Sequence, residues 1–583
     1  MKTEVRFLLA IFLMLGVLVG TNLLFPPIPP EELPLDSLGA GPAVGGPSSA
    51  DPTGTGDGAA GALVPEIPTS SAPRLPSVGA AAPVELPTDP AALREYRITV
   101  EGPLYRYEFS NYGARLMSAQ MSEFEALNRE GLVDLVKEGS GGYMGQKLLV
   151  GEDTVDLSGV PFTVEPSNGL TMSSRSGART LRFVYEHPTS PFVFVLEYEF
   201  NPDEYTVGVR GTVESGLERP LLLTDLGEGL AYSEADSVGE SRTMAYVTNN
   251  VQEGIQSTLL GKAEPTIVEG PLLWAAFKNK FFVMALLAGE SDEAATEARY
   301  LGGVIVQPTE TEGVVRVASA QPLSNDGSFA YRVFLGPQEY ALLSSLGQGM
   351  EEVNPYGWKF FQPILRPIVS VIMTIFVYLH TKLSVGYGWV LVIFGVMMRV
   401  VLFPLNHKAM KAQLRNMAVQ PLLKEIQTKY KDQPEKLQKE MMRLYKEHGF
   451  NPLAGCLPML LPWPVLIALF FVFQNTIELR GEQFLWLPDL SAPDPIYLLP
   501  VFLGLSMFLM MYVSHKSLDT PNPQMKMMMY LMPIMMVFIF FRLASGLNLY
   551  YLVANIATIP QQVWIARERL KMKGKPPLKM KSE

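Results

Sequence analysis

The sequence predicts a polytopic α-helical membrane protein with one large all-β domain outside the membrane. Three observations support this fold class. Apolar residues concentrate near the N-terminus and again after Trp358, the long stretch between them is acidic and alternates with a period of two, and the C-terminal part is basic. The 583 residues carry a net charge of −11. That value is the sum of a negative charge on the soluble domain and a smaller positive charge on the membrane domain.

The first predicted element is a signal anchor at residues 1–25. The stretch MKTEVRFLLAIFLMLGVLVGTNLLF has a basic start and an apolar run about as long as a bilayer span. No small-x-small cleavage site follows in FPPIPPEELP, so we expect an uncleaved anchor with its N-terminus in the cytoplasm. Residues 26–90 are rich in Pro, Ala, Gly and Ser, which predicts a disordered linker.

Residues 91–336 predict one large β-sandwich. Segments with alternating apolar and polar residues recur between turns rich in Gly, Pro, Asn and Asp. The clearest of them are Arg97–Val100, Tyr105–Ser110, Phe192–Phe200, Tyr205–Val213, Phe281–Ala288, Gly303–Gln307, Gly313–Ala320 and Phe329–Gly336. None of these strands carries a cluster of catalytic residue types.

Residues 337–385 connect this domain to the membrane. Pro337 opens a short helix, and the apolar run Trp358–Tyr378 follows. Because the run is interrupted by Lys359, Arg366 and two prolines, we expect an amphipathic helix in the outer interface rather than a span.

Positive charge sets the predicted topology of the rest. Asn406–Leu457 carries ten Lys or Arg against five acidic residues, and the tail at 566–583 carries seven against two. Both should be cytoplasmic. Five spans then form a core at 386–565, and the anchor makes six, so both termini are cytoplasmic. The five lie at about 386–405, 458–478, 496–513, 527–541 and 547–565.

Arg399 lies inside the first core span, which has no acidic residue to pair with it. A charge at that depth costs a few kcal/mol or more unless it faces water or a partner. One interpretation is an arginine whose head reaches the nearby headgroups. The other is a hydrated, positively charged cavity open to one side of the membrane.

Two further segments have both a structural and a functional interpretation. The cytoplasmic segment 406–450 predicts a basic helical hairpin. It is either a stable hairpin with a solvated face or a docking surface for an acidic partner such as ribosomal RNA, with Lys424, Lys429, Lys431 and Lys436 as candidates. Seven methionines between Met525 and Met536 suit either a packed or lipid-facing helix or a client-contacting face formed by Met528, Met532 and Met535.

Enzymatic chemistry is not expected. The chain has one cysteine and five scattered histidines, and it contains no CxxC, HExxH, GxxxxGK[ST] or GxSxG pattern. We therefore expect no metal, no cofactor and no nucleotide site.

The membrane half resembles the YidC/Oxa/Alb family of membrane protein insertases. The resemblance is carried by MMRVVLFPL, by KEHGFNPLAGCLPMLLPWPVLIALFFVF, by LWLPDLSAPDPIYLLPVFLG and by MPIMMVFIFFRLASGLNLYYLVANIATIPQQ, in this order. The anchor, linker and β domain resemble the Gram-negative bacterial form. The resemblance implies an inner-membrane protein with a periplasmic β domain and a five-helix core around a groove open to the cytoplasm and the lipid. Arg399, Tyr550 and Tyr551 match groove positions of the family.

The function implied by the resemblance is insertion and folding of nascent membrane proteins. The partners would be those nascent chains, the lipid bilayer, the Sec translocon with SecYEG and SecDF-type subunits, and the ribosome through the hairpin and tail. Two other classes stay open on the residues alone. One is an assembly scaffold that depends on Sec partners, and the other is a secondary transporter that binds an anion at Arg399.

Overall fold

The computed structural model describes residues 81–82, 94–150, 153–214, 220–289, 300–309, 311, 314–354, 361–430, 433–447, 463–516 and 523–573. The predicted signal anchor and nearly all of the predicted linker lie outside these residues. The chain divides into two compact units. The larger unit holds the β domain and most of the helices, and the described part of the smaller unit is a helical hairpin within 411–447.

The strands are β1 (Ala81–Ala82), β2 (Arg97–Glu101), β3 (Tyr105–Ser110), β4 (Leu116–Glu125), β5 (Leu132–Asp134), β6 (Gln146–Val150), β7 (Asp153–Asp156), β8 (Thr163–Glu165), β9 (Leu170–Thr171), β10 (Arg179–Glu186), β11 (Val193–Phe200), β12 (Thr206–Glu214), β13 (Leu221–Gly227), β14 (Ala245–Asn250), β15 (Gly254–Leu259), β16 (Thr266–Lys278), β17 (Phe282–Ala288), β18 (Leu301–Pro308), β19 (Val315–Pro322) and β20 (Ser328–Pro337). The helices are α2 (Ser237–Ser241), α3 (Tyr340–Ser345), α4 (Gln362–Leu383), α5 (Tyr387–Lys429), α6 (Pro434–Glu447), α8 (Trp463–Asn475), α9 (Leu498–Lys516), α10 (Pro523–Phe540) and α11 (Ser545–Lys573). Short 3-10 turns occur at Leu260–Lys262, Met350–Glu352 and Ile477–Leu479.

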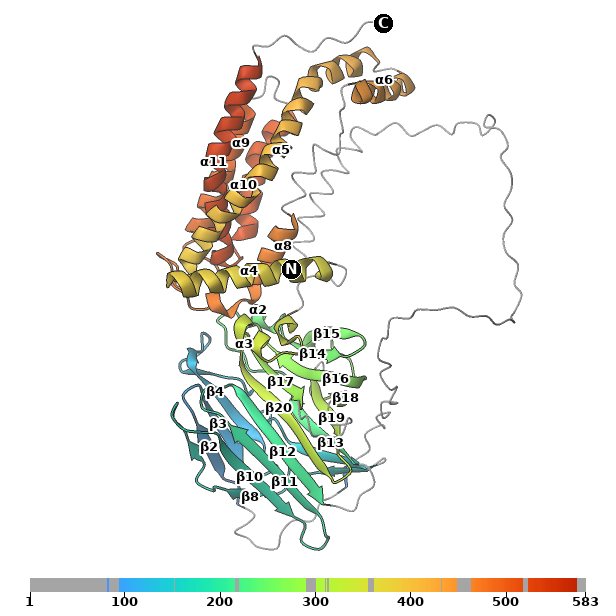
Figure 1. Ribbon diagram of the computed structural model, residues 1–583, viewed down its shortest axis with the longest axis vertical. Helices are drawn as coiled ribbons and strands as arrows, with labels where there is room; N and C mark the ends of the chain where they lie inside the picture. Colours follow the sequence, from blue (N-terminus) through green and yellow to red (C-terminus); the bar gives the residue numbers. More distant parts are fainter. Residues whose placement is uncertain are drawn as a thin grey trace, which may run out of the picture. The chain divides into compact units, whose positions relative to one another are not determined.

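The β domain is a sandwich of a 15-stranded sheet and a 5-stranded sheet (Figure 1). The large sheet follows the order β1-β7-β6-β13-β19-β18-β16-β17-β20-β12-β11-β10-β8, with β14 and β15 attached at β16, and the small sheet follows β5-β4-β3-β2-β9. Each of the eight strand segments expected from the sequence lies on a strand, and the predicted large sandwich is confirmed. Ala81–Ala82, within the predicted linker, adds a short parallel strand beside β7.

Alternation of side chains explains the core of this sandwich. In β11 every second residue is buried, from Phe194 through Leu196 and Tyr198 to Phe200, as a strand with one face on a core requires. Phe200 meets Tyr105 and Tyr107 from β3, whose rings stack with centroids 4.4 Å apart. Aromatic packing of this kind between the two sheets fixes their spacing.

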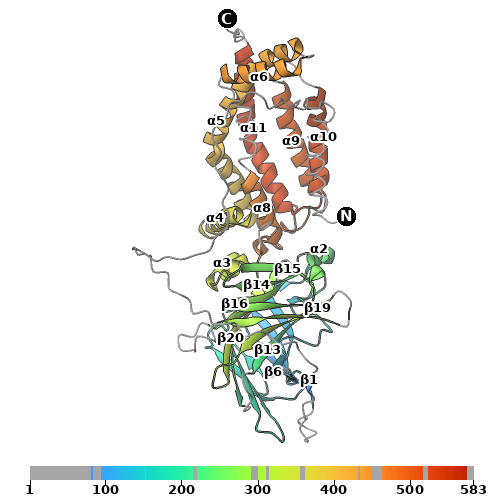
Figure 2. The same ribbon diagram turned by 90° about the vertical axis from the view of Figure 1, so that its right-hand side faces the viewer.

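The helices of the larger unit have their own apolar core, formed by α4, α5, α8 and α11. α9 packs against both α10 and α11, and α4 packs against α8. Figures 1 and 2 show α9, α10 and α11 running alongside one another, with α4 lying crosswise to them. α5 approaches α11 closely at Gly395, where an added Cβ would lie 3.1 Å from Val553 Cγ1.

Among the described helices, Gln362–Leu383 and Tyr387–Pro404 are long and apolar enough to cross a membrane. The apolar parts of α8, α9 and α10 are shorter, at Pro464–Asn475, Leu498–Val513 and Met529–Phe540. Length and composition therefore do not decide whether α4 lies in the interface or crosses the membrane as α5 does. The six spans and the interfacial position of α4 stay predictions.

The described part of the smaller unit is the end of α5 together with α6. Leu422 and Ile426 of α5 are buried against Leu444 of α6, with Leu437 and Met441 packed at the side. These apolar contacts hold the two helices together as a hairpin, because each helix has one apolar face and buries it against the other helix.

Candidate functional site

The candidate site lies where α5 and α11 face each other. Tyr550 of α11 is 5% exposed and its ring packs against Phe394 of α5 and Phe473 of α8, with centroids 5.9 and 6.1 Å away. Tyr551 is half-buried and makes an edge contact of 5.3 Å with Phe540 of α10. Successive residues of a helix point about 100° apart, so Tyr550 fills the helical core while Tyr551 occupies its edge.

Arg399 lies on α5 one turn beyond Gly395 and is half-buried. Its guanidinium is close enough to Tyr550 and Tyr551 to interact electrostatically with both phenols. Within the part of the chain that the structure describes, it makes no hydrogen bond and no ion pair. The three residues expected from the sequence are therefore brought together, around a cation whose donors are free for another group.

A second polar feature near this site was missed by the sequence analysis. Asn555 of α11 is buried and donates from Nδ2 to Ser506 Oγ of α9 over 3.1 Å. Thr558 is buried as well and donates to the Ala554 carbonyl. Asn555 follows Tyr551 by four residues, so both lie on one face of α11. That spacing of polar residues in an apolar helix was the signal available in the sequence.

The other residues proposed from the sequence are only partly described. Met532 and Met535 of α10 are half-buried, and Lys429 and Lys436 of the hairpin are exposed. Lys429 Nζ lies 5.5 Å from the ring centre of Tyr430. The side chains of Met528 and Lys424, and all of Lys431, lie outside the described residues. Their proposed contacts with clients and with the ribosome stay predictions.

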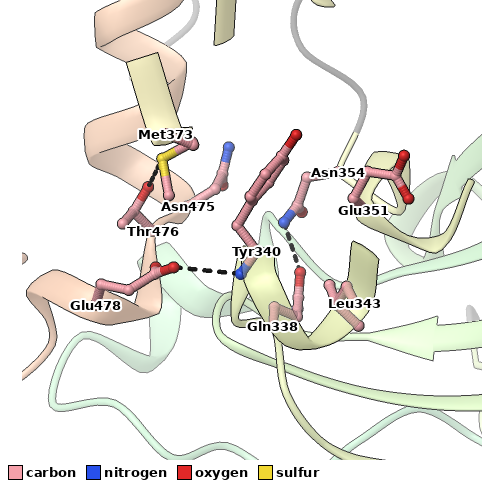
Figure 3. Close-up of a pocket in the computed structure, with 9 residues that line it drawn as sticks. All are labelled: Gln338, Tyr340, Leu343, Glu351, Asn354, Met373, Asn475, Thr476 and Glu478. Carbon is pink, nitrogen blue, oxygen red and sulfur yellow. Dashed lines mark hydrogen bonds between the residues drawn. The ribbon is translucent and has the colours of Figure 1, made fainter. Parts of the chain in front are cut away.

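A polar junction joins the β domain to α4 and α8 (Figure 3). Glu478, just beyond the end of α8, accepts a hydrogen bond from the Tyr340 backbone N–H over 3.2 Å. The Tyr340 hydroxyl donates to Ser370 of α4 over 2.9 Å, and Arg366 of α4 pairs with Glu352 over 2.9 Å. Glu478 Oε2 is buried at this junction and has no hydrogen-bond partner among the described residues.

A buried ion pair strengthens the same junction. Arg480 Nε lies 2.8 Å from Glu234 Oε1, with the two side chains only 5% and 8% exposed. Arg480 also donates to the Glu125 carbonyl over 2.8 Å and covers the ring of Phe282. Glu240 accepts the backbone N–H groups of Ser233 and Glu234, which holds the loop that presents Glu234.

Comparison with known proteins identifies the chain. Residues 97–371 match the family model described as YidC periplasmic domain, and residues 378–573 match the model described as 60Kd inner membrane protein. The chain is 31% identical to the membrane protein insertase YidC of Chlorobium luteolum over 82% of this chain and 83% of that protein. The chain belongs to the YidC family. It is also 30% identical to the membrane protein insertase YidC of Chlorobaculum tepidum over 87% of each chain.

A solved structure titled as an active YidC insertase with its first transmembrane domain is similar over 80% of this chain and 92% of that one, at 19% identity and a TM-score of 0.33. The identification rests on the sequence matches. It confirms the family expected from the membrane half, an inner-membrane location and a periplasmic β domain. The number of spans and the side on which each terminus lies stay predictions.

Proposed function

We propose that this chain inserts nascent proteins into the inner membrane through a hydrophilic groove between α5, α9 and α11 that opens to the cytoplasm and the lipid. Membership of the YidC family supports the insertase function, since the matched relatives carry that name. The observation that carries the groove is Arg399, a half-buried cation beside Tyr550 and Tyr551 with no charged partner among the described residues.

The physical basis is a shortened apolar path. A client carries a polar, often acidic, segment that must cross the bilayer ahead of its apolar helix. Water and polar groups such as Asn555 and Ser506 lower the cost of that passage, and Arg399 attracts the negative charge more strongly where the local dielectric constant is low. Burial of the client's apolar helix in lipid then drives the reaction, so no nucleotide is required.

The crosswise α4 and its ties to the β domain support an interfacial position for α4 at the periplasmic face. Tyr340, Ser370, Arg366 and Glu352 connect it to the β domain, which would hold α4 flat beneath that domain. In this arrangement the β domain closes the outer end of the core, and clients enter from the cytoplasm.

Reconstitution tests the insertase function. The purified chain is placed alone in liposomes, a client with one or two spans is translated in its presence, and protease protection of the translocated tail is scored. Protection well above empty liposomes supports an insertase that works without Sec. No protection with folded, correctly oriented protein would contradict autonomous insertion and favour the scaffold that needs Sec partners. Uptake of a labelled anion would favour the transporter.

Substitution of Arg399 tests the groove mechanism. Arg399→Ala should weaken insertion of clients with acidic translocated tails more than insertion of clients with neutral tails, and Arg399→Lys should retain part of the activity. Arg542, which is exposed in the turn between α10 and α11, gives the matched control Arg542→Ala. Equal insertion of acidic-tailed clients by Arg399→Ala and Arg542→Ala would refute the role of Arg399.

We further propose that the exposed lysines of the hairpin, Lys429 and Lys436 among them, bind the ribosome during synthesis of the client. Co-sedimentation with ribosomes should fall for the double variant Lys429→Glu, Lys436→Glu and should weaken with salt, as contacts to nucleic-acid phosphates do. Unchanged co-sedimentation would assign ribosome binding to another segment.

A further inference from the structure

The β domain carries an exposed apolar patch where it contacts the loop after α8. Two segments form the patch: residues 125–132, at the turn between β4 and β5, and residues 231–241, which include α2. In the described part of the β domain seven large apolar side chains are exposed, and four of them lie on these two segments: Leu127, Leu132, Tyr232 and Val238. Single exposed apolar residues are normal on a protein surface, whereas a group of them indicates a contact with an apolar partner.

Hydrogen bonds hold the two segments of the apolar patch together. The Leu127 N–H donates to the Ser233 carbonyl over 2.8 Å, and Asn128 Nδ2 donates to the Tyr232 carbonyl over 2.7 Å. The buried carboxylate of Glu240 accepts the Ser233 N–H over 3.0 Å. The apolar side chains are therefore presented by a fixed backbone.

The apolar patch adjoins the loop that connects α8 to α9. Arg480 of this loop pairs with Glu234 over 2.8 Å and donates to the Glu125 carbonyl over 2.8 Å, so it contacts both segments. Arg480 follows Asn475, the last residue of α8, by five positions, and five residues of 3-10 turn rise about 10 Å. The headgroup layer on one side of a bilayer is about 5–8 Å thick. With α8 spanning the membrane as predicted, the patch therefore lies beside the outer headgroups.

The loop after α8 presents apolar side chains of its own. Phe484 and Leu487 exchange backbone hydrogen bonds of 3.0 and 2.9 Å, which closes a tight turn and leaves Leu485 75% exposed and Trp486 36% exposed. Leu485 has a φ of +56°, a conformation that is unfavourable for a bulky residue. A strained turn that holds a leucine and a tryptophan outward suits a contact with lipid, because tryptophan is enriched at membrane interfaces.

We propose that the apolar patch of the β domain inserts into the headgroup region of the outer leaflet, together with the turn at residues 484–487. Apolar side chains gain free energy at the boundary between headgroups and acyl chains, and tyrosine suits this boundary because its ring is apolar and its hydroxyl polar. The exposed charges beside the patch, Arg129, Glu130 and Asp236, stay in the hydrated headgroup layer. The lipid thus holds the β domain at the membrane in addition to its buried ion pair with the loop after α8.

Two tyrosines of the native chain provide a matched comparison. Tyr232 in the patch is 42% exposed and Tyr96 is 40% exposed. Tyr96 precedes β2 and lies at the level of Leu116, the first residue of β4. β4 runs for ten residues from there to Glu125 beside the patch, so Tyr96 lies about 30 Å from the patch. Equal exposure predicts equal reactivity unless lipid covers one of the two side chains.

The test is hydroxyl-radical footprinting of the full chain in liposomes of phosphatidylethanolamine and phosphatidylglycerol, with the β domain outside. Tyr232 should be oxidised several-fold more slowly than Tyr96. The double variant Leu127→Glu, Val238→Glu should bring the rate at Tyr232 back toward that at Tyr96, because charged side chains keep the patch out of the lipid. Equal oxidation of Tyr232 and Tyr96 in the native chain would overturn the proposal.

A spin label at Val238 separates lipid from a protein partner. The chain has one cysteine, Cys456, so Val238→Cys and Tyr96→Cys are labelled with a nitroxide in a Cys456→Ser background. In the same liposomes the label at Val238 should be more accessible to oxygen, which dissolves in lipid, than to a water-soluble nickel complex, and the label at Tyr96 should show the reverse. A Val238 label shielded from both reagents would show that a protein covers the patch, and one as open to nickel as Tyr96 would show that nothing does. Either result overturns the proposal, and footprinting of the native chain remains the test if the Cys456→Ser background fails to fold.

Discussion

Replacing Arg480 by methionine should destabilise the contact between the β domain and the loop after α8. The Arg480 and Glu234 side chains are 5% and 8% exposed and 2.8 Å apart. Methionine keeps most of the volume of arginine but leaves the Glu234 carboxylate buried without its counter-charge. Removing one partner of a buried pair costs about 3–5 kcal/mol, and the hydrogen bond to the Glu125 carbonyl is lost as well.

A matched ion pair shows how burial sets this magnitude. Arg210 and Glu199 also form an ion pair, but their side chains are 62% and 41% exposed. Exposed pairs contribute about 0–1 kcal/mol, so Arg210→Met should change stability by no more than that. The double variant Arg480→Met, Glu234→Gln should recover much of the loss, because it buries no unpaired charge.

The assay is urea unfolding of the β domain in the full chain in nanodiscs, followed by circular dichroism. Hydrogen exchange of the segments around Glu234 and Arg480 reports local separation. We expect Arg210→Met to have the highest free energy of unfolding of the three variants and Arg480→Met to have the lowest. The double variant should lie between them. Suppose that Arg480→Met lowers the free energy of unfolding no more than Arg210→Met does, and that hydrogen exchange near Glu234 is unchanged. The argument that burial makes the Arg480–Glu234 pair important for this contact is then refuted.

Two further substitutions test the helical core. Gly395→Leu should cost about 1–3 kcal/mol by overpacking α5 against Val553, and a melting temperature like the native one would show that the helices can separate freely. Asn555→Ala should cost about 1 kcal/mol through the lost bond to Ser506 and should reduce client insertion, whereas a purely structural role would lower stability and leave insertion by the folded protein intact.

Much of this architecture could be predicted from local patterns in the sequence. Period-two alternation located strands such as β3 and β11, because burying one face of a strand demands it. Composition located the apolar runs and the basic segments. The strand order of the large sheet could not be derived in this way, since alternation marks which face of a strand is buried and leaves its neighbours open.

The sequence by itself determined the division into an acidic β domain and a basic membrane domain, the family, and Arg399 as the charge that an apolar span has to accommodate. Only the tertiary structure decided what surrounds that charge. Tyr550 packs in the helical core between Phe394 and Phe473, whereas Tyr551 lies at the edge of that core. Asn555 bonds to Ser506 from another helix. The tertiary structure also joined Arg480 to Glu234 across 246 residues. Composition and periodicity are local properties of the chain, whereas these partners are chosen by packing between elements distant in sequence.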